Sequence, residues 1–143
     1  AGGTGDIFWR IAGAELPEGQ CFYGQHYATL HEDNTLTLFD NGNGHTPPCT
    51  RILRLQINPE TGEVTGGGDL LPAGSAYFSM ACGAVGWFGD HFVVGWGWCH
   101  QEQENNRLVT EHDASGHEIF GLRHNAPNYL MNSLNSSYRC VKY

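Results

Sequence analysis

The chain has little positive charge and no long hydrophobic run. Its 143 residues include seven Lys or Arg against 15 Asp or Glu, a formal net charge of −8, and Lys142 is the only lysine. Nucleic acids and anionic membrane surfaces are bound through clusters of basic residues, so we expect neither as a partner. The longest apolar run, Phe92 to Cys99, is far shorter than the roughly 20 residues that cross a bilayer as a helix, so we expect no membrane span.

The signatures of common catalytic and metal sites are also missing. The sequence contains no C-x-x-C, H-x-x-x-H or C-x-x-C-H spacing, no G-x-S-x-G and no phosphate-binding loop. Asp40 to Gly44 begins like a calcium loop, but no bidentate carboxylate follows at the required spacing, which favours a polar turn. We therefore expect no metal and no cofactor.

The sequence instead contains an internal repeat. At a spacing of about 56 residues, Leu36-Thr37-Leu38 aligns with Phe92-Val93-Val94, and Arg51-Ile52-Leu53 aligns with Arg107-Leu108-Val109. Repetition with this period indicates tandem copies of one supersecondary unit, each of which needs a neighbour to bury its apolar face.

Each copy has the pattern of antiparallel strands joined by tight turns. Short β-rich runs alternate with turns rich in Gly, Asn, Asp and Pro, and no window has a sustained helical spacing of apolar residues. Strands are predicted at 35–39, 51–57 and from 63 in the first copy, and at 91–95, 107–112 and 117–122 in the second. Four strands per tandem unit is typical of a β-propeller blade, so the predicted fold class is all-β.

The ends of the chain fit the same unit. Thr4 to Trp9 resembles Ser115 to Phe120, the end of the second copy, and a further strand is predicted near 137–143. The predicted organisation is an outer strand of a preceding blade with a linker at 1–20, blade units at 21–76 and 77–124, and a closing segment at 125–143. These are about two and a half blades, whereas a closed propeller has about four to eight. We therefore expect further blades, from the same polypeptide or from other chains.

Five cysteines favour an oxidising compartment, and hence a secreted, extracellular or periplasmic protein supported by disulfides. Cys49 and Cys99 lie at equivalent places in the two units, so neighbouring blades would bring them together, but the pairing stays open. Buried free thiols in a cytosolic protein are the alternative.

Several segments resemble the arylsulfotransferase family. They are GDIFWRIAG (5–13), the Gln25-His26 pair, FDNGNGH (39–45), TRILRLQINPETGEV (50–64), VGWG (94–97) and TEHDASGHEIF (110–120). The resemblance runs along nearly the whole chain and implies the C-terminal part of a propeller that transfers sulfate without a nucleotide donor. In that chemistry a histidine takes the sulfuryl group from an aryl sulfate and passes it to a phenol, and imidazole is a competent nucleophile when neutral.

The resemblance implies four site residues. His26 is a candidate catalytic residue in the channel, with a hydrogen-bonded structural histidine as the alternative. His100, after VGWGWC, is a candidate nucleophile, with a surface-loop histidine as the alternative. Asn41 and Arg51 are candidates for binding the sulfate, although the repetition of Arg51 at Arg107 is equally consistent with an arginine that stabilises each blade.

Two functions of different classes therefore stand. The first is an aryl sulfate sulfotransferase acting through a histidine intermediate. The second is a non-catalytic extracellular propeller that serves as a binding or assembly module, because function resides in the site and not in the fold.

Overall fold

The computed structural model describes residues 5–71, 78–99, 107–123 and 136–137. Within these ranges the protein is almost entirely β, as predicted, and the one helical element is the short 3₁₀ turn η1 (Gly13–Glu15). None of the described residues form a helix long and apolar enough to cross a membrane.

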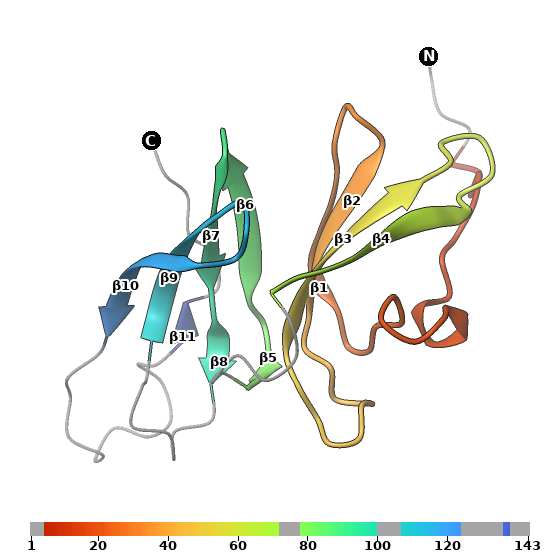
Figure 1. Ribbon diagram of the computed structural model, residues 1–143. Coiled ribbons are helices and arrows are strands. Elements are labelled where there is room, and N and C mark those ends of the chain that lie inside the picture. The colour runs from red at the N-terminus through yellow and green to blue at the C-terminus, as the bar shows by residue number, and fades with distance from the viewer. Residues whose placement is uncertain (1–4, 72–77, 100–106, 124–135, 138–143) are drawn as a thin grey trace.

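The two sequence repeats form two four-stranded antiparallel sheets (Figure 1). In the first sheet the strands follow chain order, β1 (His26–Leu30), β2 (Thr35–Asp40), β3 (Arg51–Ile57) and β4 (Val64–Leu71). The second sheet has the same order, β6 (Ala84–Phe88), β7 (His91–Gly95), β9 (Arg107–Asp113) and β10 (Glu118–Arg123). The starts of β2, β3, β7 and β9 are those predicted from the sequence.

A third, smaller sheet was not predicted. It joins β5 (Ser79–Ala81), β8 (Gly97–Cys99) and β11 (Ser136–Ser137) in the order β11-β8-β5. Its strands have two or three residues and pair across long stretches of chain, so neither strand length nor a local turn signal identifies them. The predicted closing strand at 137–143 lies mostly outside the described residues.

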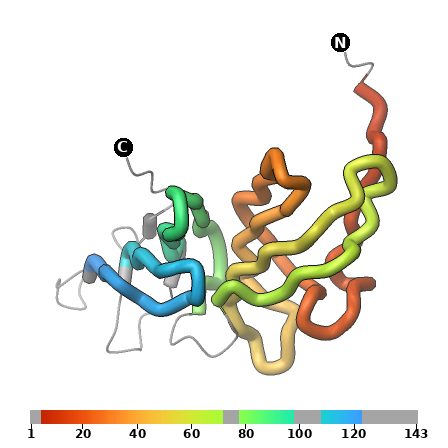
Figure 2. Tube along the Cα trace, turned by 45° about the horizontal axis from the view of Figure 1, so that its top comes forward, coloured from red at the N-terminus to blue at the C-terminus, as the bar shows by residue number. Residues whose placement is uncertain are grey.

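Each face of the first sheet packs against a different part of the chain. Successive side chains of a strand point to opposite faces. On one face, Phe39 and Ile52 belong to a core cluster shared with the second sheet. On the other face, Leu38, Leu53 and Leu55 pack with Trp9, Ile11, Leu16 and Phe22 of the N-terminal segment. Figure 2 shows the resulting succession of N-terminal segment, first sheet and second sheet.

The two sheets stack in the same orientation, so equivalent faces point the same way. The second sheet contacts the first through Phe92 and Val94, which are the repeat equivalents of Leu36 and Leu38. The face of the second sheet that contacts the first sheet is therefore equivalent to the face of the first sheet that contacts the N-terminal segment. Such head-to-tail stacking is the packing expected of tandem units. The described residues form no closed ring.

The segment predicted as an outer strand of a preceding blade is extended but pairs with no strand in the described part of the chain. Residues 5–8 project from the body, with Ile7 and Phe8 84% and 90% exposed. From Trp9 onward the segment turns onto the first sheet, where the Trp9 indole N–H donates to the Pro59 carbonyl oxygen at 3.1 Å.

Three cysteines with described side chains, Cys21, Cys49 and Cys82, are free thiols. Disulfide support is therefore not found among them. The side chains of Cys99 and Cys140 lie outside the described residues, and so does the suggested Cys49–Cys99 pair.

Candidate functional site

His26 opens β1 beside an irregularity of the sheet. The pairing of β1 with β2 shifts register between His26 and Thr29, as in a β-bulge. Tyr27, inside the bulge, has φ 47°, a left-handed conformation that is uncommon for a non-glycine residue. Bulges re-aim side chains and are frequent next to functional sites.

The half-buried His26 ring is hydrogen-bonded to the fully buried side chain of Asn41. The His26 Nδ1 atom lies 2.6 Å from Asn41 Oδ1 and 3.1 Å from the Gly24 carbonyl oxygen. Both neighbours are acceptors, so Nδ1 carries the proton and donates. In the neutral imidazole, Nε2 is then left with the lone pair. The sequence singled out both residues, and the structure brings them together.

The orientation of the Asn41 amide is fixed by its other contacts. Its Nδ2 donates to the Ser79 carbonyl oxygen at 2.9 Å and to the Cys82 carbonyl oxygen at 3.0 Å. Because Nδ2 must face these two acceptors, Oδ1 must face His26. Cys82, the repeat equivalent of His26, has φ 63°, so two of the three left-handed non-glycine residues among the described ones flank this pair. The second unit thus supports the histidine of the first.

Thr50, the residue before β3, joins the same network. Its hydroxyl accepts the Ser79 backbone N–H at 2.8 Å and lies 3.2 Å from the Asn41 carbonyl oxygen, to which it donates. Thr50, Asn41 and Ser79 are at most 1% exposed. Buried polar groups that are all hydrogen-bonded hold their geometry tightly, so Asn41 is pre-organised before any ligand arrives.

Asp40, the residue before Asn41, is the centre of a second buried network. Its Oδ1 accepts the backbone N–H groups of Tyr23 at 2.8 Å and Gly42 at 2.9 Å. Its Oδ2 accepts from His45 Nε2 at 2.9 Å and from the Arg51 guanidinium at 3.1 and 3.2 Å. Gly42 has φ 68°, and a Cβ there would collide with the Cys49 carbonyl oxygen, so the turn requires glycine.

Arg51 is committed to this network. Arg51 is 5% exposed. Its Nη1 donates to Asp69 Oδ1 at 3.0 Å, and its Nε and Nη2 donate to Asp40. Nη2 also donates to the Cys21 carbonyl oxygen. A guanidinium offers five N–H groups, and most of these are used by the protein itself. These contacts favour the structural role for Arg51 that its repetition at Arg107 left open.

The contribution of Asp69 to the stability of this network depends on pH. Burial raises the pKa of the Asp69 carboxyl, against the opposing effect of the Arg51 charge. A raised pKa means that the folded state holds the proton more tightly than the unfolded state. The resulting stabilisation is present below the ordinary Asp pKa of 3.8 and is lost as the pH rises through the folded-state pKa.

We therefore expect Asp69→Asn, which keeps an acceptor for Arg51, to gain stability relative to the unmodified chain as the pH rises from acid to neutral. The measurement is urea unfolding of both proteins across this range. Asp90→Asn, at a side chain that is 88% exposed, is the surface control. The free energy of unfolding of Asp69→Asn minus that of the unmodified chain should increase toward neutral pH. A value that stays constant or decreases would refute the assignment.

His100 lies outside the described residues, so its predicted role as nucleophile stays a prediction.

The sequence analysis did not identify Asp40, Thr50 and Ser79 as members of the hydrogen-bond networks. Asp40 and Thr50 stand inside the FDNG and Thr-Arg segments and could have been found there. Ser79 and Cys82 contribute backbone carbonyls across the boundary between the units, and no residue-type signal marks such contacts.

No group of three or more His, Cys, Asp or Glu side chains in the described ranges is arranged to hold a metal ion. Comparison of the chain with protein-family models, with curated proteins and with solved structures finds no match.

Proposed function

We propose that this chain is part of an arylsulfotransferase-like β-propeller in which His26 accepts a sulfuryl group from an aryl sulfate. The observation that carries the proposal is the contact between His26 Nδ1 and Asn41 Oδ1. It selects the tautomer whose Nε2 has a lone pair, which is the form that a nucleophilic histidine needs.

The proposed transfer has two steps. In the first, the Nε2 lone pair attacks sulfur, the bond from sulfur to the aryl oxygen breaks, and an aryloxide leaves. In the second, the oxygen of an acceptor phenol attacks sulfur, its proton passes to solvent, and the bond from Nε2 to sulfur breaks. Between the steps the ring is positively charged, and the Nδ1–H bond to Asn41 becomes a charge-assisted hydrogen bond.

Asn41 is in this scheme a positioning residue. The carbonyls of Ser79 and Cys82 hold its amide, and Asp40 and Arg51 hold the turn that follows β2. A preorganised acceptor costs no rearrangement at the moment of reaction, which is how such groups accelerate charge-forming steps.

The proposed propeller is supported by the stacking of the two sheets in the same orientation. Each unit has four strands in chain order, and the second packs on the first through the repeat equivalents of Leu36 and Leu38. Continued stacking of such units in a ring produces a propeller, with further blades from this polypeptide or from other chains. The five cysteines of the sequence support a secreted, extracellular or periplasmic location as part of the same proposal.

A second function, a non-catalytic assembly module, is supported by a different observation. The outer strand β10 exposes Ile119, Phe120 and Leu122 by half or more. Monomeric proteins expose few clustered apolar side chains outside interaction sites, so this strand favours contact with another sheet.

The two functions are separated by incubating the native protein with para-nitrophenyl sulfate, with and without a phenol as acceptor. The enzyme predicts continuous release of para-nitrophenol that depends on the acceptor. A folded protein that releases none under either condition would leave the assembly module as the function.

A further inference from the structure

The loop between β2 and β3 contains two asparagines that are each followed by glycine, Asn41-Gly42 and Asn43-Gly44. No other asparagine of the sequence precedes a glycine. Asparagine is a thermolabile residue. The backbone nitrogen of the next residue can attack its side-chain carbonyl carbon, and glycine, which has no Cβ, hinders this attack least. From the sequence alone the two pairs are equally reactive.

The fold protects the first pair. Asn41 and Gly42 are both buried, and the Asn41 amide is held by the hydrogen bonds described above. The Gly42 backbone N–H donates to the Tyr23 carbonyl oxygen and to Asp40 Oδ1, each at 2.9 Å. A backbone nitrogen that serves two acceptors keeps its proton and its place, so it cannot attack the neighbouring side chain unless the loop opens.

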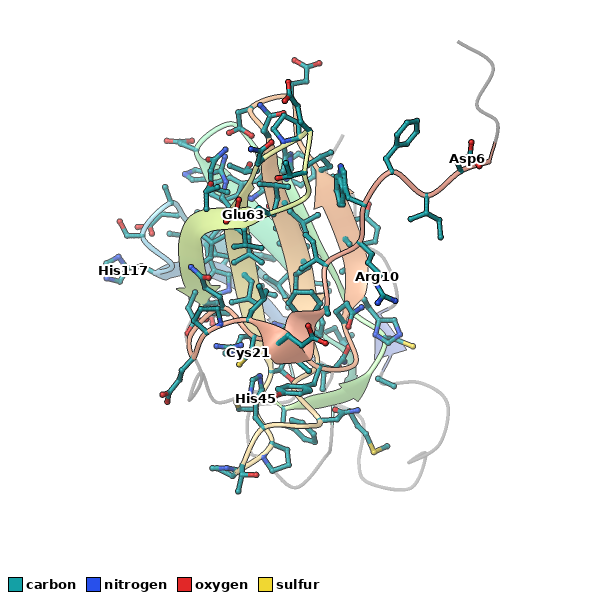
Figure 3. The ribbon with its side chains drawn as sticks, turned by 90° about the vertical axis from the view of Figure 1, so that its right-hand side faces the viewer. Asp6, Arg10, Cys21, His45, Glu63 and His117 are labelled. Atoms are coloured by element: carbon teal, nitrogen blue, oxygen red, sulfur yellow. The ribbon has the colours of Figure 1, made fainter. Side chains whose placement is uncertain are left out.

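The second pair is open to reaction. Asn43 and Gly44 are both exposed. Figure 3 shows the loop that carries them, next to His45, projecting beyond the end of the first sheet. The Gly44 N–H makes no hydrogen bond to any residue that the structure describes. The attacking nitrogen of this pair is therefore free, whereas that of the first pair is occupied.

The Asn43 side chain joins the two units. Its Nδ2 donates to the carbonyl oxygen of Met80, in β5, at 3.0 Å. A carboxylate in its place has no hydrogen to donate and would face this carbonyl as a second acceptor. Asn43 also lies beside Gly24, where an added Cβ would be 3.5 Å from Asn43 Nδ2, and the Gly24 carbonyl oxygen accepts from His26. A change at Asn43 therefore alters contacts next to His26.

We propose that Asn43 is a site of spontaneous deamidation in the folded protein, whereas Asn41 is protected. The Gly44 nitrogen attacks Cγ of Asn43, the bond from Cγ to Nδ2 breaks, and ammonia leaves with the proton that Gly44 gives up to solvent. Water then opens the cyclic imide at either carbonyl, which produces aspartate or isoaspartate. One water is consumed for each ammonia released. The product loses the hydrogen bond to Met80, and none of these steps depends on sulfate transfer.

The test is to incubate the native protein in buffers of neutral to mildly alkaline pH and to follow both asparagines by mass spectrometry with peptide fragmentation. Exchange of NH₂ for OH raises the mass of the fragment that contains the modified residue. The rate at Asn43 should rise with pH, because the attacking nitrogen must lose its proton. It should exceed the rate at Asn41 by at least about tenfold, since reaction at Asn41 requires local opening of buried hydrogen bonds.

The same protein unfolded in guanidinium chloride is the matched control. Both pairs then have the same local surroundings, so Asn41 and Asn43 should be converted at similar rates. Conversion of Asn41 as fast as Asn43 in the native protein would overturn the inference. A native protein that converts neither, while the unfolded protein converts both, would also overturn it.

The loss of the contact between the units is tested with Asn43→Asp, by amide hydrogen exchange of the peptide that contains β5. Its amides should exchange several-fold faster than in the unmodified chain, because loss of a hydrogen bond lowers the free energy of local opening. Asn58→Asp is the control, since Asn58 uses Oδ1, which accepts from the Glu60 and Thr61 N–H groups and which a carboxylate retains. Unchanged exchange of β5 in Asn43→Asp would refute the role of Asn43 in joining the units.

Discussion

Replacing His26 with glutamine should reduce the proposed aryl sulfate turnover by a factor on the order of 10⁴, because loss of the proposed nucleophile removes the covalent route altogether. Glutamine can still donate a hydrogen bond to Asn41, but its amide nitrogen has no lone pair available for attack on sulfur. The measurement is the rate of para-nitrophenol release from the native protein in the presence of a phenol.

His31→Gln is the matched control for this prediction. His31 also belongs to the first unit and also bonds a side-chain oxygen, with Nε2 2.9 Å from Thr37 Oγ1. Its substitution should leave turnover within about twofold, since a hydrogen bond remote from the reacting atoms contributes little to the chemical step.

Chemical rescue distinguishes a nucleophile from a structural histidine. In His26→Gly, added imidazole can enter the vacated space, bond Asn41 through one nitrogen and attack sulfur through the other. Part of the lost rate should return and should saturate with imidazole. A His26→Gly protein that keeps the unmodified rate, or a loss that imidazole does not relieve in a correctly folded protein, would contradict the nucleophilic role.

The second large effect concerns stability. Asp40→Asn should lower the free energy of unfolding by about 3–5 kcal/mol, the usual cost of breaking a buried ion pair by removing one partner, because Arg51 then keeps only Asp69, whose side chain is 25% exposed, as a charged partner. The partner is Arg51, whose side chain is 6% exposed and whose guanidinium bonds an Asp40 oxygen at 3.1 Å. Urea unfolding followed by circular dichroism measures the change.

Asp33→Asn supplies the comparison, because the Asp33–Arg54 pair is exposed and exposed pairs contribute little. The double variant Asp40→Asn/Arg51→Met should recover part of the lost stability, since the buried guanidinium that has lost its Asp40 partner is then gone. An Asp40→Asn protein as stable as the unmodified chain would show that Arg51 does not depend on Asp40.

The strands were predictable because their signals are local. β2, β3, β7 and β9 begin where apolar runs follow turns such as the one before Thr35 and the one before His91. The third sheet was not predictable, because Ser79, Trp98 and Ser136 are brought together only by the packed units.

The sequence offered His26, Asn41 and Arg51 as separate candidates, but their hydrogen bonds could not be predicted from it. His26 and Asn41 were identified separately, and their hydrogen bond depends on the bulge at Tyr27, which no sequence signal marks. Arg51 was a candidate for binding sulfate, but the buried carboxylate next to Asn41 captures its guanidinium. Such capture depends on burial, which the residue pattern leaves undetermined.

The N-terminal segment shows the limit of reasoning from repeats. Its likeness to Ser115–Phe120 predicts an outer strand, and in the structure residues 5–8 are exposed and pair with no described strand. Its continuation from Trp9 has no counterpart in the repeat and packs on the first sheet instead. Local similarity to the repeat therefore could not predict where residues 9–22 pack.

The account is tested most directly by trapping the proposed intermediate. The native protein is mixed with para-nitrophenyl sulfate without an acceptor, quenched in alkali to preserve a bond between nitrogen and sulfur, and its peptides are mapped by mass spectrometry. We predict one sulfuryl group on the peptide that contains His26, and its disappearance when a phenol is added before the quench. Turnover accompanied by a sulfuryl group on a different histidine, such as His100, would contradict the assignment of His26.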